Sequence, residues 1–143
     1  MKSNIIDKAL KSLDIQENFI IIHSNLLAFF KKTHHTPEKV WEIIYNNYKD
    51  KTIIMPAFTF SINKNKKIIW DYKKTRSETG SLTEFFRNKI SQKRTIHPIH
   101  SVSIFGPHYK DIPDHNCKSS FGVGSTWEWL SNNKNVCNLS SRL

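Results

Sequence analysis

Apolar residues in the first 55 positions follow two kinds of spacing. At residues 4–13 they recur with helical periodicity, and a second helical stripe follows Thr36 and Pro37, which suit the cap and first turn of a helix. The runs 19–22 and 52–55 are continuous and rich in β-branched residues, as is typical of strands buried on both faces. The order helix, strand, helix, strand predicts a right-handed parallel crossover.

A long polar connection separates these elements from two further helices. Residues 57–79 are polar and basic, and a connection of this length inside a compact domain is typical of a binding loop. Two capping boxes, Ser81 with Glu84 and Ser125 with Glu128, each predict the start of a helix.

Short apolar runs at 102–104 and 136–139 predict two further strands. We therefore expect one α/β domain over residues 1–143, with a largely parallel sheet flanked by helices. We expect the sheet to be truncated before its later strands, which would leave an unpaired edge and exposed apolar surface around Val136 and Leu139.

The chain is basic, with 22 Lys and Arg against 12 Asp and Glu and a net charge of +10. Because 38% of its residues are hydrophobic, it can bury a core, and no apolar stretch approaches the roughly 18–20 residues of a membrane span. Cys117 and Cys137 fit no CxxC spacing, so neither a zinc ribbon nor a disulfide framework is indicated. These features predict a soluble intracellular protein.

Much of the positive charge is concentrated between residues 61 and 94, where ten basic residues face three acidic ones, Asp71, Glu78 and Glu84. Such a segment attracts phosphates, whether of nucleic acid or of a phosphorylated cofactor. The alternative is a set of lysine-rich, solvated loops, and no helix-turn-helix, zinc-finger or RNP pattern accompanies the charge. Charge alone therefore does not decide the function.

Two segments carry residues suited to binding or catalysis. His23 and Ser24 directly follow the first expected strand, where open α/β sheets bind ligands, although such residues also serve to satisfy backbone groups. His97 and His100 are three apart, but the intervening Pro98 argues against a helical zinc site, and a hydrogen bond within a turn is favoured for His97.

Two weaker patterns leave the chemistry open. The glycine pair in residues 121–125 can hold an anion on backbone N–H groups, but a simple tight turn explains it better. Serines and histidines are present for a nucleophile pair, yet the chain has no GxSxG elbow, which argues against a hydrolase.

A more specific pattern consists of four pieces in order: HSNL at 23–26, MPAFT at 55–59, GSLTEFFR at 80–87 and HPIHSV at 97–102. Together they resemble the aminoglycoside N(3)-acetyltransferase family, and the likeness extends from about residue 19 to residue 139. The resemblance implies a cytoplasmic α/β enzyme that transfers acetyl from acetyl-coenzyme A to an amine of an aminoglycoside or amino sugar, without a metal. It also makes the phosphates of coenzyme A, rather than nucleic acid, the expected target of the positive charge.

The resemblance implies two sets of ligand-binding residues. Those expected along the path of coenzyme A are Ser24, Asn25, Leu26, His100, Ser101, Val102 and Ser103. Those expected to face the acceptor amine are Phe58, Thr59, Asp71 and Glu78. The general-base histidine of the family lies in a later segment than any in these 143 residues, so we expect an incomplete site. The alternative is an inactive remnant or a basic phosphate- or nucleic-acid-binding module.

Overall fold

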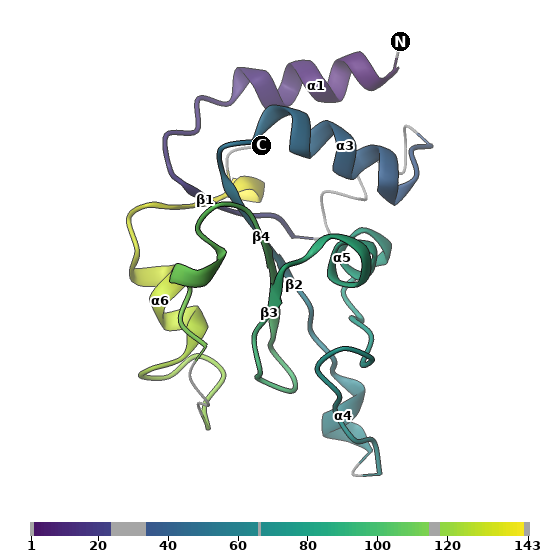
Figure 1. Cartoon of the computed structure of the whole chain (residues 1–143), viewed down its shortest axis with the longest axis vertical. Helices are drawn as coiled ribbons and strands as arrows, with labels where there is room; N and C mark the ends of the chain where they lie inside the picture. The colour runs from purple at the N-terminus through teal and green to yellow at the C-terminus, as the bar shows by residue number, and fades with distance from the viewer. Residues whose placement is uncertain (1, 24–33, 66, 115–117, 142–143) are drawn as a thin grey trace.

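The computed structural model describes residues 2–23, 34–65, 67–114 and 118–141, which form a five-stranded sheet between helices (Figure 1). The elements are, in order, α1 (Lys2–Ser12), β1 (Phe19–Ile21), α3 (Pro37–Asn47), β2 (Thr52–Pro56), α4 (Ser61–Lys64), α5 (Ser81–Phe85), the π-helical turn η1 (Phe86–Ile90), β3 (Lys93–Arg94), β4 (Val102–Phe105), the 3-10 turn η2 (Tyr109–Asp111), α6 (Thr126–Asn132), β5 (Val136–Asn138) and the 3-10 turn η3 (Leu139–Ser141).

The strand order is β3-β4-β2-β1-β5. Strand β1 runs parallel to both neighbours, with Ile20 opposite Ile53 of β2 and Cys137 of β5, which confirms the predicted parallel pairing of the first two strands. Strand β4 is antiparallel to β2, with Val102 opposite Pro56, and β3 is antiparallel to β4. The α/β class is confirmed, and the parallel arrangement holds for β2-β1-β5, while β3 and β4 make the whole sheet mixed. Strands β3 and β4 form a hairpin in which β3 runs in the direction of β2, so β4, the returning strand, lies antiparallel between them.

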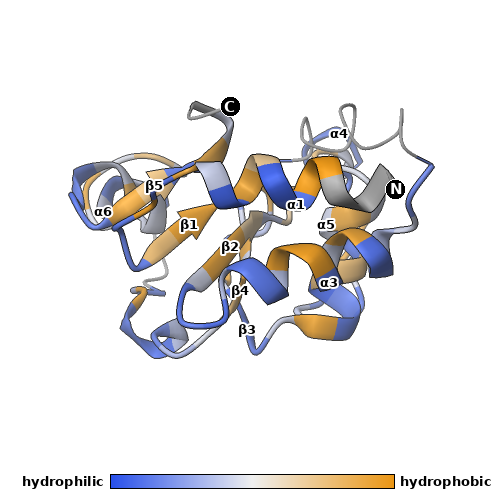
Figure 2. Ribbon diagram, turned by 90° about the horizontal axis from the view of Figure 1, so that it is seen from above, coloured by the Kyte–Doolittle hydropathy of each residue, from blue (hydrophilic) through white to orange (hydrophobic). Residues whose placement is uncertain are grey.

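The sheet separates two apolar cores, because successive residues of a strand point to opposite faces. Ile20 and Ile53 face the core under α1, α3 and α5, and Figure 2 shows α1 and α3 lying side by side above the hydrophobic strands. Phe19, Ile21 and Ile54 face the second core, which α6 and the turn η2 cover on the opposite side. The molecule is therefore layered as helix, sheet and helix, with β1 and β2 buried on both faces.

Local capping decides where the helices begin. The side chain of Thr36 accepts a hydrogen bond from Lys39 N and that of Ser125 accepts one from Glu128 N, so both predicted caps are confirmed. The predicted capping box at Ser81 is wrong, because Ser81 is the first residue of the helix and not its cap. The cap position is occupied by Gly80, whose φ of 131° suits only glycine, and no side chain caps this helix.

The expected apolar exposure near the last strand is wrong for Leu139. This side chain is fully buried, and it packs with Cys137 against the core under α1 and α3, because the turn η3 folds it back over the sheet. Val136 is partly buried against the second core. Within the described ranges, no helix is long and apolar enough to cross a membrane.

Candidate ligand-binding site at the carboxyl edge of the sheet

The carboxyl ends of β1 and β2 and the start of β4 meet at one edge of the sheet. His23 follows β1, Phe58 follows β2, and His100 precedes β4, whose antiparallel direction brings its first residues to the same edge. The rings of Phe58 and His100 lie 4.9 Å apart, and the α6 residue Trp127 lies 5.7 Å from Phe58 and stacks on His23 at 6.4 Å. This edge is where ligands bind in open α/β sheets.

We call this cluster the aromatic face; its members are His23, Phe58, Phe60, His100, Phe121 and Trp127. Phe60 and Phe121 remain 44% and 61% exposed although each contacts the His100 ring. Trp127 fixes the arrangement by donating its Nε1–H to the carbonyl oxygen of His100 at 3.1 Å. Exposed rings around a polar imidazole suit a ligand that is partly apolar and carries a hydrogen-bonding group.

His97 and His100 are joined by a serine that the sequence did not single out. Nδ1 of His97 accepts hydrogen bonds from Ile99 N (3.2 Å) and His100 N (3.0 Å), which confirms the predicted turn role of His97. Ser120 Oγ lies 3.3 Å from Nε2 of His97 and 2.7 Å from Nδ1 of His100. Burial lowers the pKa of both imidazoles, and the neighbouring His97 lowers that of His100 further.

A buried arginine anchors the segment on the other side of His100. Arg94 Nε donates to Ser101 Oγ at 3.0 Å, and its terminal nitrogens donate to the carbonyl oxygens of Ala57 and Thr75. The guanidinium also lies 5.2 Å from the ring centre of Trp70. Burial lowers the pKa of Arg94 to about 10, so the group stays charged at neutral pH. Sequence reasoning counted Arg94 only as surface charge, because nothing in the pattern shows that it folds inward.

The residues expected along the coenzyme A path fall into three groups. Ser24, Asn25 and Leu26 lie outside the described residues. Ser101, Val102 and Ser103 are fully buried. The hydroxyl of Ser101 donates to Ala57 O at 2.9 Å, and that of Ser103 has no hydrogen-bond partner among the described residues. His100 is therefore the member of the described set that a ligand can reach directly.

The residues expected to face the acceptor amine are also divided. Phe58 belongs to the aromatic face, whereas Thr59 is buried and donates its hydroxyl to Arg76 O. Glu78 holds the start of α4, accepting from Phe60 N at 2.9 Å and from the Ser61 hydroxyl. Hydrogen bonding by Ser61 lowers the pKa of Glu78, which keeps it ionised beside the aromatic face. Asp71 accepts from Lys74 N and Lys73 N in a local turn, and these bonds lower its pKa. The Asp71 carboxylate is therefore engaged within its own turn.

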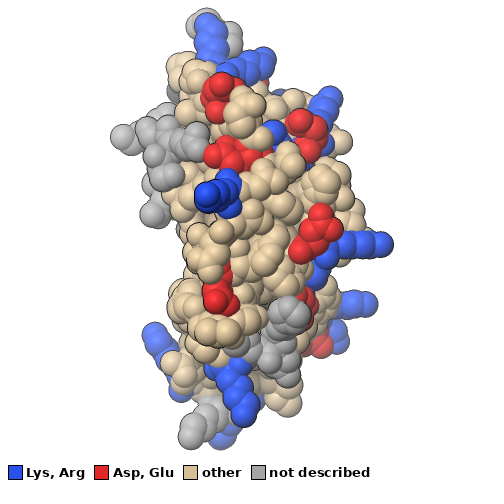
Figure 3. Space-filling model, turned by 90° about the vertical axis from the view of Figure 1, so that its left-hand side faces the viewer, with Lys and Arg blue, Asp and Glu red and all other residues tan. Residues whose placement is uncertain are grey.

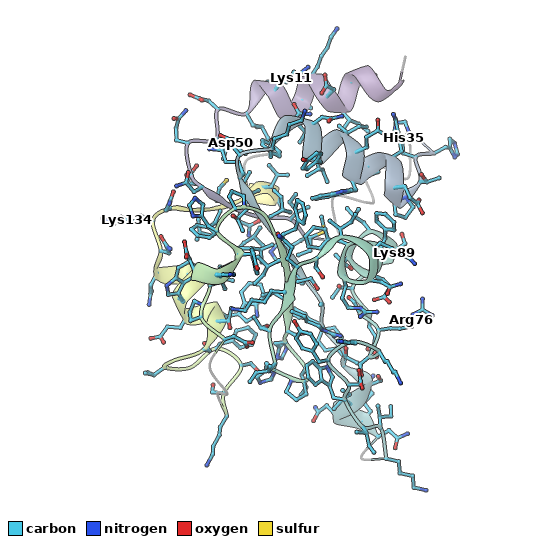
Figure 4. All side chains as sticks on the ribbon, viewed as in Figure 1. Lys11, His35, Asp50, Arg76, Lys89 and Lys134 are labelled. Carbon is cyan, nitrogen blue, oxygen red and sulfur yellow. The ribbon has the colours of Figure 1, made fainter. Side chains whose placement is uncertain are left out.

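The predicted basic segment does not form one continuous positive surface. Arg87 is buried and makes two hydrogen bonds to Glu84, and Lys93 donates to Ile112 O. Arg76 and Lys89 point outward on the α5 side, away from the sheet (Figure 4). On the side of α6, which Figure 3 shows, carboxylates also lie among the Lys and Arg side chains, so the positive charge is not gathered there either. The described part of the chain holds no group of three or more His, Cys, Asp and Glu residues placed to bind a metal ion.

Comparison with known proteins relates this fold to acetyltransferases. A search of the curated proteins finds no match. Among solved structures, the YokD protein from Bacillus subtilis matches with a TM-score of 0.70 and 18% identity, over 92% of this chain and 61% of that one. AAC-VIa bound to sisomicin matches with a TM-score of 0.68 and 15% identity, over 90% of this chain and 55% of that one.

A third structure, AAC-IIIb in a binary complex with CoASH, matches with a TM-score of 0.67 and 14% identity, again over 90% of this chain and 55% of that one. The chain thus spans little more than half the length of these relatives. The family model of the aminoglycoside 3-N-acetyltransferases matches residues 21–136, which begin at the last residue of β1 and include the whole of β2, β4 and α6. The chain therefore belongs to the aminoglycoside 3-N-acetyltransferase family.

Proposed function

We propose that this chain contributes to acetyl transfer from acetyl-coenzyme A to the amine of an amino sugar or aminoglycoside, and that its aromatic face contacts the coenzyme. The family match over residues 21–136 is the observation that carries the proposal. Two relatives of the same fold support it, one solved with CoASH and one with bound sisomicin. We propose the activity for the site to which this chain contributes, since these relatives are longer than the chain.

Acetyl transfer makes two demands on an active site. The ammonium group first gives a proton to a base, and the free amine nitrogen then bonds to the thioester carbonyl carbon. The C–S bond breaks, and a second proton from the nitrogen passes to the thiolate, so that coenzyme A leaves as its thiol. A donor near the carbonyl oxygen stabilises the charge that develops there. We assign to His100 a polar contact of this kind, while by resemblance the base comes from a later segment of the family's sequence. Family members meet both demands without a metal, by the same resemblance.

The aromatic face offers coenzyme A apolar surface, a hydrogen-bonding group and a nearby positive charge. The exposed rings of Phe60 and Phe121 offer surface to the apolar or planar parts of a ligand, and His100 adds a polar group between them. Exposed Lys64 is the last residue of α4, the short helix that begins directly after Phe60. A positive charge at this position attracts the phosphates of the coenzyme.

The charge around the site favours an amino sugar with few amines over a polycationic aminoglycoside. Glu78, next to Phe60, offers an ionised carboxylate to a cationic amine. The surrounding segment, residues 61–94, carries ten basic and three acidic residues, a net charge of +7. A single ammonium group can pair with Glu78, whereas the further positive charges of a polycationic ligand find few carboxylates in this segment.

Isothermal titration of the folded chain with coenzyme A tests the proposal. We expect saturable binding that weakens when 3′-dephospho-coenzyme A is used. Phe121→Ala should weaken binding about two- to tenfold, as expected for the loss of one ring contact. The control is Ile5→Ala, which removes an equally exposed apolar side chain on the remote helix α1. Absence of heat in a folded sample would contradict the proposal, and salt-dependent binding of RNA instead would favour the nucleic-acid alternative.

A further inference from the structure

The proton on His97 can be assigned from its backbone contacts. Two N–H groups, those of Ile99 and His100, donate to Nδ1 of His97 at 3.2 and 3.0 Å. A nitrogen that accepts hydrogen bonds carries no proton, so the neutral ring must carry its proton on Nε2. Pro98, which has no N–H, lies within the turn and leaves both donated bonds to the two residues that follow it.

The orientation of the Ser120 hydroxyl follows from that assignment. Its Oγ lies 3.3 Å from Nε2 of His97, and since that nitrogen carries the proton, Ser120 accepts this bond. The hydroxyl proton is then free to point at Nδ1 of His100, 2.7 Å away, which has no other hydrogen-bond partner in the described part of the chain. The three side chains form a chain of hydrogen bonds with one direction, from His97 through Ser120 to His100.

The geometry points to Ser120 as a positioning residue that holds His100 neutral with its proton on Nε2, so that His100 donates a hydrogen bond to a carbonyl oxygen of the coenzyme A ester or of its pantetheine amides. The ligand in this inference rests on the proposed function. The ring of His100 is only half-buried, and none of the described residues bonds to its Nε2. The aromatic contacts of Phe58 and Phe121, each at 4.9 Å, hold the ring without competing for that nitrogen.

This arrangement excludes His100 as the base of the reaction while the relay is intact. To act as a base through Nε2, His100 would have to carry its proton on Nδ1. Ser120 Oγ would then accept hydrogen bonds from both imidazoles, and neither ring would accept the proton of the Ser120 hydroxyl. The lowered pKa of both rings agrees with two neutral imidazoles at pH 7. The other titratable group that lines the small hollow beside the relay is Asp114, which accepts a hydrogen bond from Ile96 N.

Long-range 1H–15N NMR of the imidazoles, without any ligand, tests the positioning role. We expect both His97 and His100 to show the Nε2–H tautomer, with His97→Asn and His100→Phe assigning the signals. Ser120→Ala should shift His100 to a mixture of tautomers and leave His97 unchanged, and Ser120→Thr should restore the wild-type pattern. Ser131→Ala, which removes an exposed serine hydroxyl on α6, is the control. An Nδ1–H tautomer at His100 in the wild type, or no change in Ser120→Ala, would overturn the inference.

Titration with coenzyme A tests the donor role separately. His100→Phe keeps an aromatic ring and removes the donor, so its affinity should fall about three- to tenfold, while His100→Gln, which retains a donor, should recover part of the loss. Equal affinity of wild type and His100→Phe would overturn the donor role. If folded wild-type protein binds no coenzyme A, the donor role fails together with the proposed function, and the tautomer measurement still decides the positioning role of Ser120.

Discussion

His100 and Ser101 are neighbours in the chain, yet they belong to two different regions of the molecule. The Ser101 hydroxyl is fully buried, donates to Ala57 O and accepts from Arg94 Nε. The His100 ring lies in the half-exposed aromatic face, where one nitrogen contacts Ser120 and the other is left for a ligand. Adjacent residues at the start of a strand point to opposite sides, so one motif serves both the interior and the surface.

The two regions differ in how far their hydrogen-bonding groups are already paired within the protein. Around Arg94, every hydrogen bond of the guanidinium is directed to an oxygen of the protein, including the carbonyl oxygens of Ala57 and Thr75. A guanidinium whose hydrogen bonds all go to protein oxygens can stabilise the fold but has no donor left to offer a ligand. Around His100, the polar atoms are fewer, and the exposed rings leave apolar surface uncovered. Substitutions on the two sides should therefore separate loss of stability from loss of binding.

The largest expected effect is that of Arg94→Met on stability. The change leaves the carbonyl oxygens of Ala57 and Thr75 and the Ser101 hydroxyl without their charged donor, which we expect to lower the free energy of unfolding by about 3 kcal/mol or more. Arg94→Lys keeps the charge but not the fork of donors, so it should recover only part of the loss. Urea unfolding measures both, and equal stability of wild type and Arg94→Met would contradict the structural role.

A smaller effect is expected from Ser101→Ala, with Ser103→Ala as its matched control. Both hydroxyls are fully buried in or next to β4, but only that of Ser101 has partners among the described residues. Ser101→Ala should cost about 1–2 kcal/mol, and Ser103→Ala should be neutral or slightly stabilising, since it removes an unsatisfied buried hydroxyl. Denaturant melts of the two variants provide the comparison, and the reverse order would show that the buried network is assigned wrongly.

The smallest expected effect is a shift of stability with pH. Burial lowers the pKa of His97 below 6.5, so the unfolded chain binds the proton more readily than the folded chain. Stability from this group is therefore complete above about pH 6.5 and is lost as the pH falls through the lowered pKa. His23 and His100 shift in the same direction.

His97→Asn tests this dependence, because the amide oxygen can replace Nδ1 as acceptor but does not titrate in this range. As the pH is lowered from about 7.5 to about 5.5, the urea concentration at the midpoint of unfolding should decrease for the wild type. The decrease should be smaller in His97→Asn. A wild-type midpoint that is constant or rises over this interval would show that the three imidazoles do not titrate as their burial requires.

The sequence was most informative where a local pattern decides the structure. The continuous apolar runs predicted β1 and β2 because both strands are buried on both faces, and Thr36 and Ser125 cap their helices as expected. His97 was also predicted correctly as a turn residue, since its partners Ile99 and His100 are only two and three residues away. The sequence also predicted that His23 follows a strand at its carboxyl end, the edge at which open α/β sheets bind ligands.

Side-chain contacts that no local sequence pattern encodes explain what the sequence did not predict. The capping box at Ser81 failed because the Glu84 carboxylate instead accepts from Ser77 N and Arg87. Ser120 carried no signal, because it lies 20 residues from His100 and 23 from His97. The motif placed Ser101 and His100 in one binding set, and only the three-dimensional structure separates the buried hydroxyl from the half-exposed ring.

The most direct test of the division between a structural and a binding region is to map coenzyme A on the folded chain by amide chemical-shift perturbation. We predict that the largest shifts occur at the aromatic face, at His23, Phe58, His100 and Trp127, while the amides of α1 stay in place. A second hollow lies between α6 and the turn η2, where Asp111, Glu128 and Trp129 line it. Shifts concentrated there, or no shifts at saturating coenzyme A, would contradict the assignment of the aromatic face as the binding region.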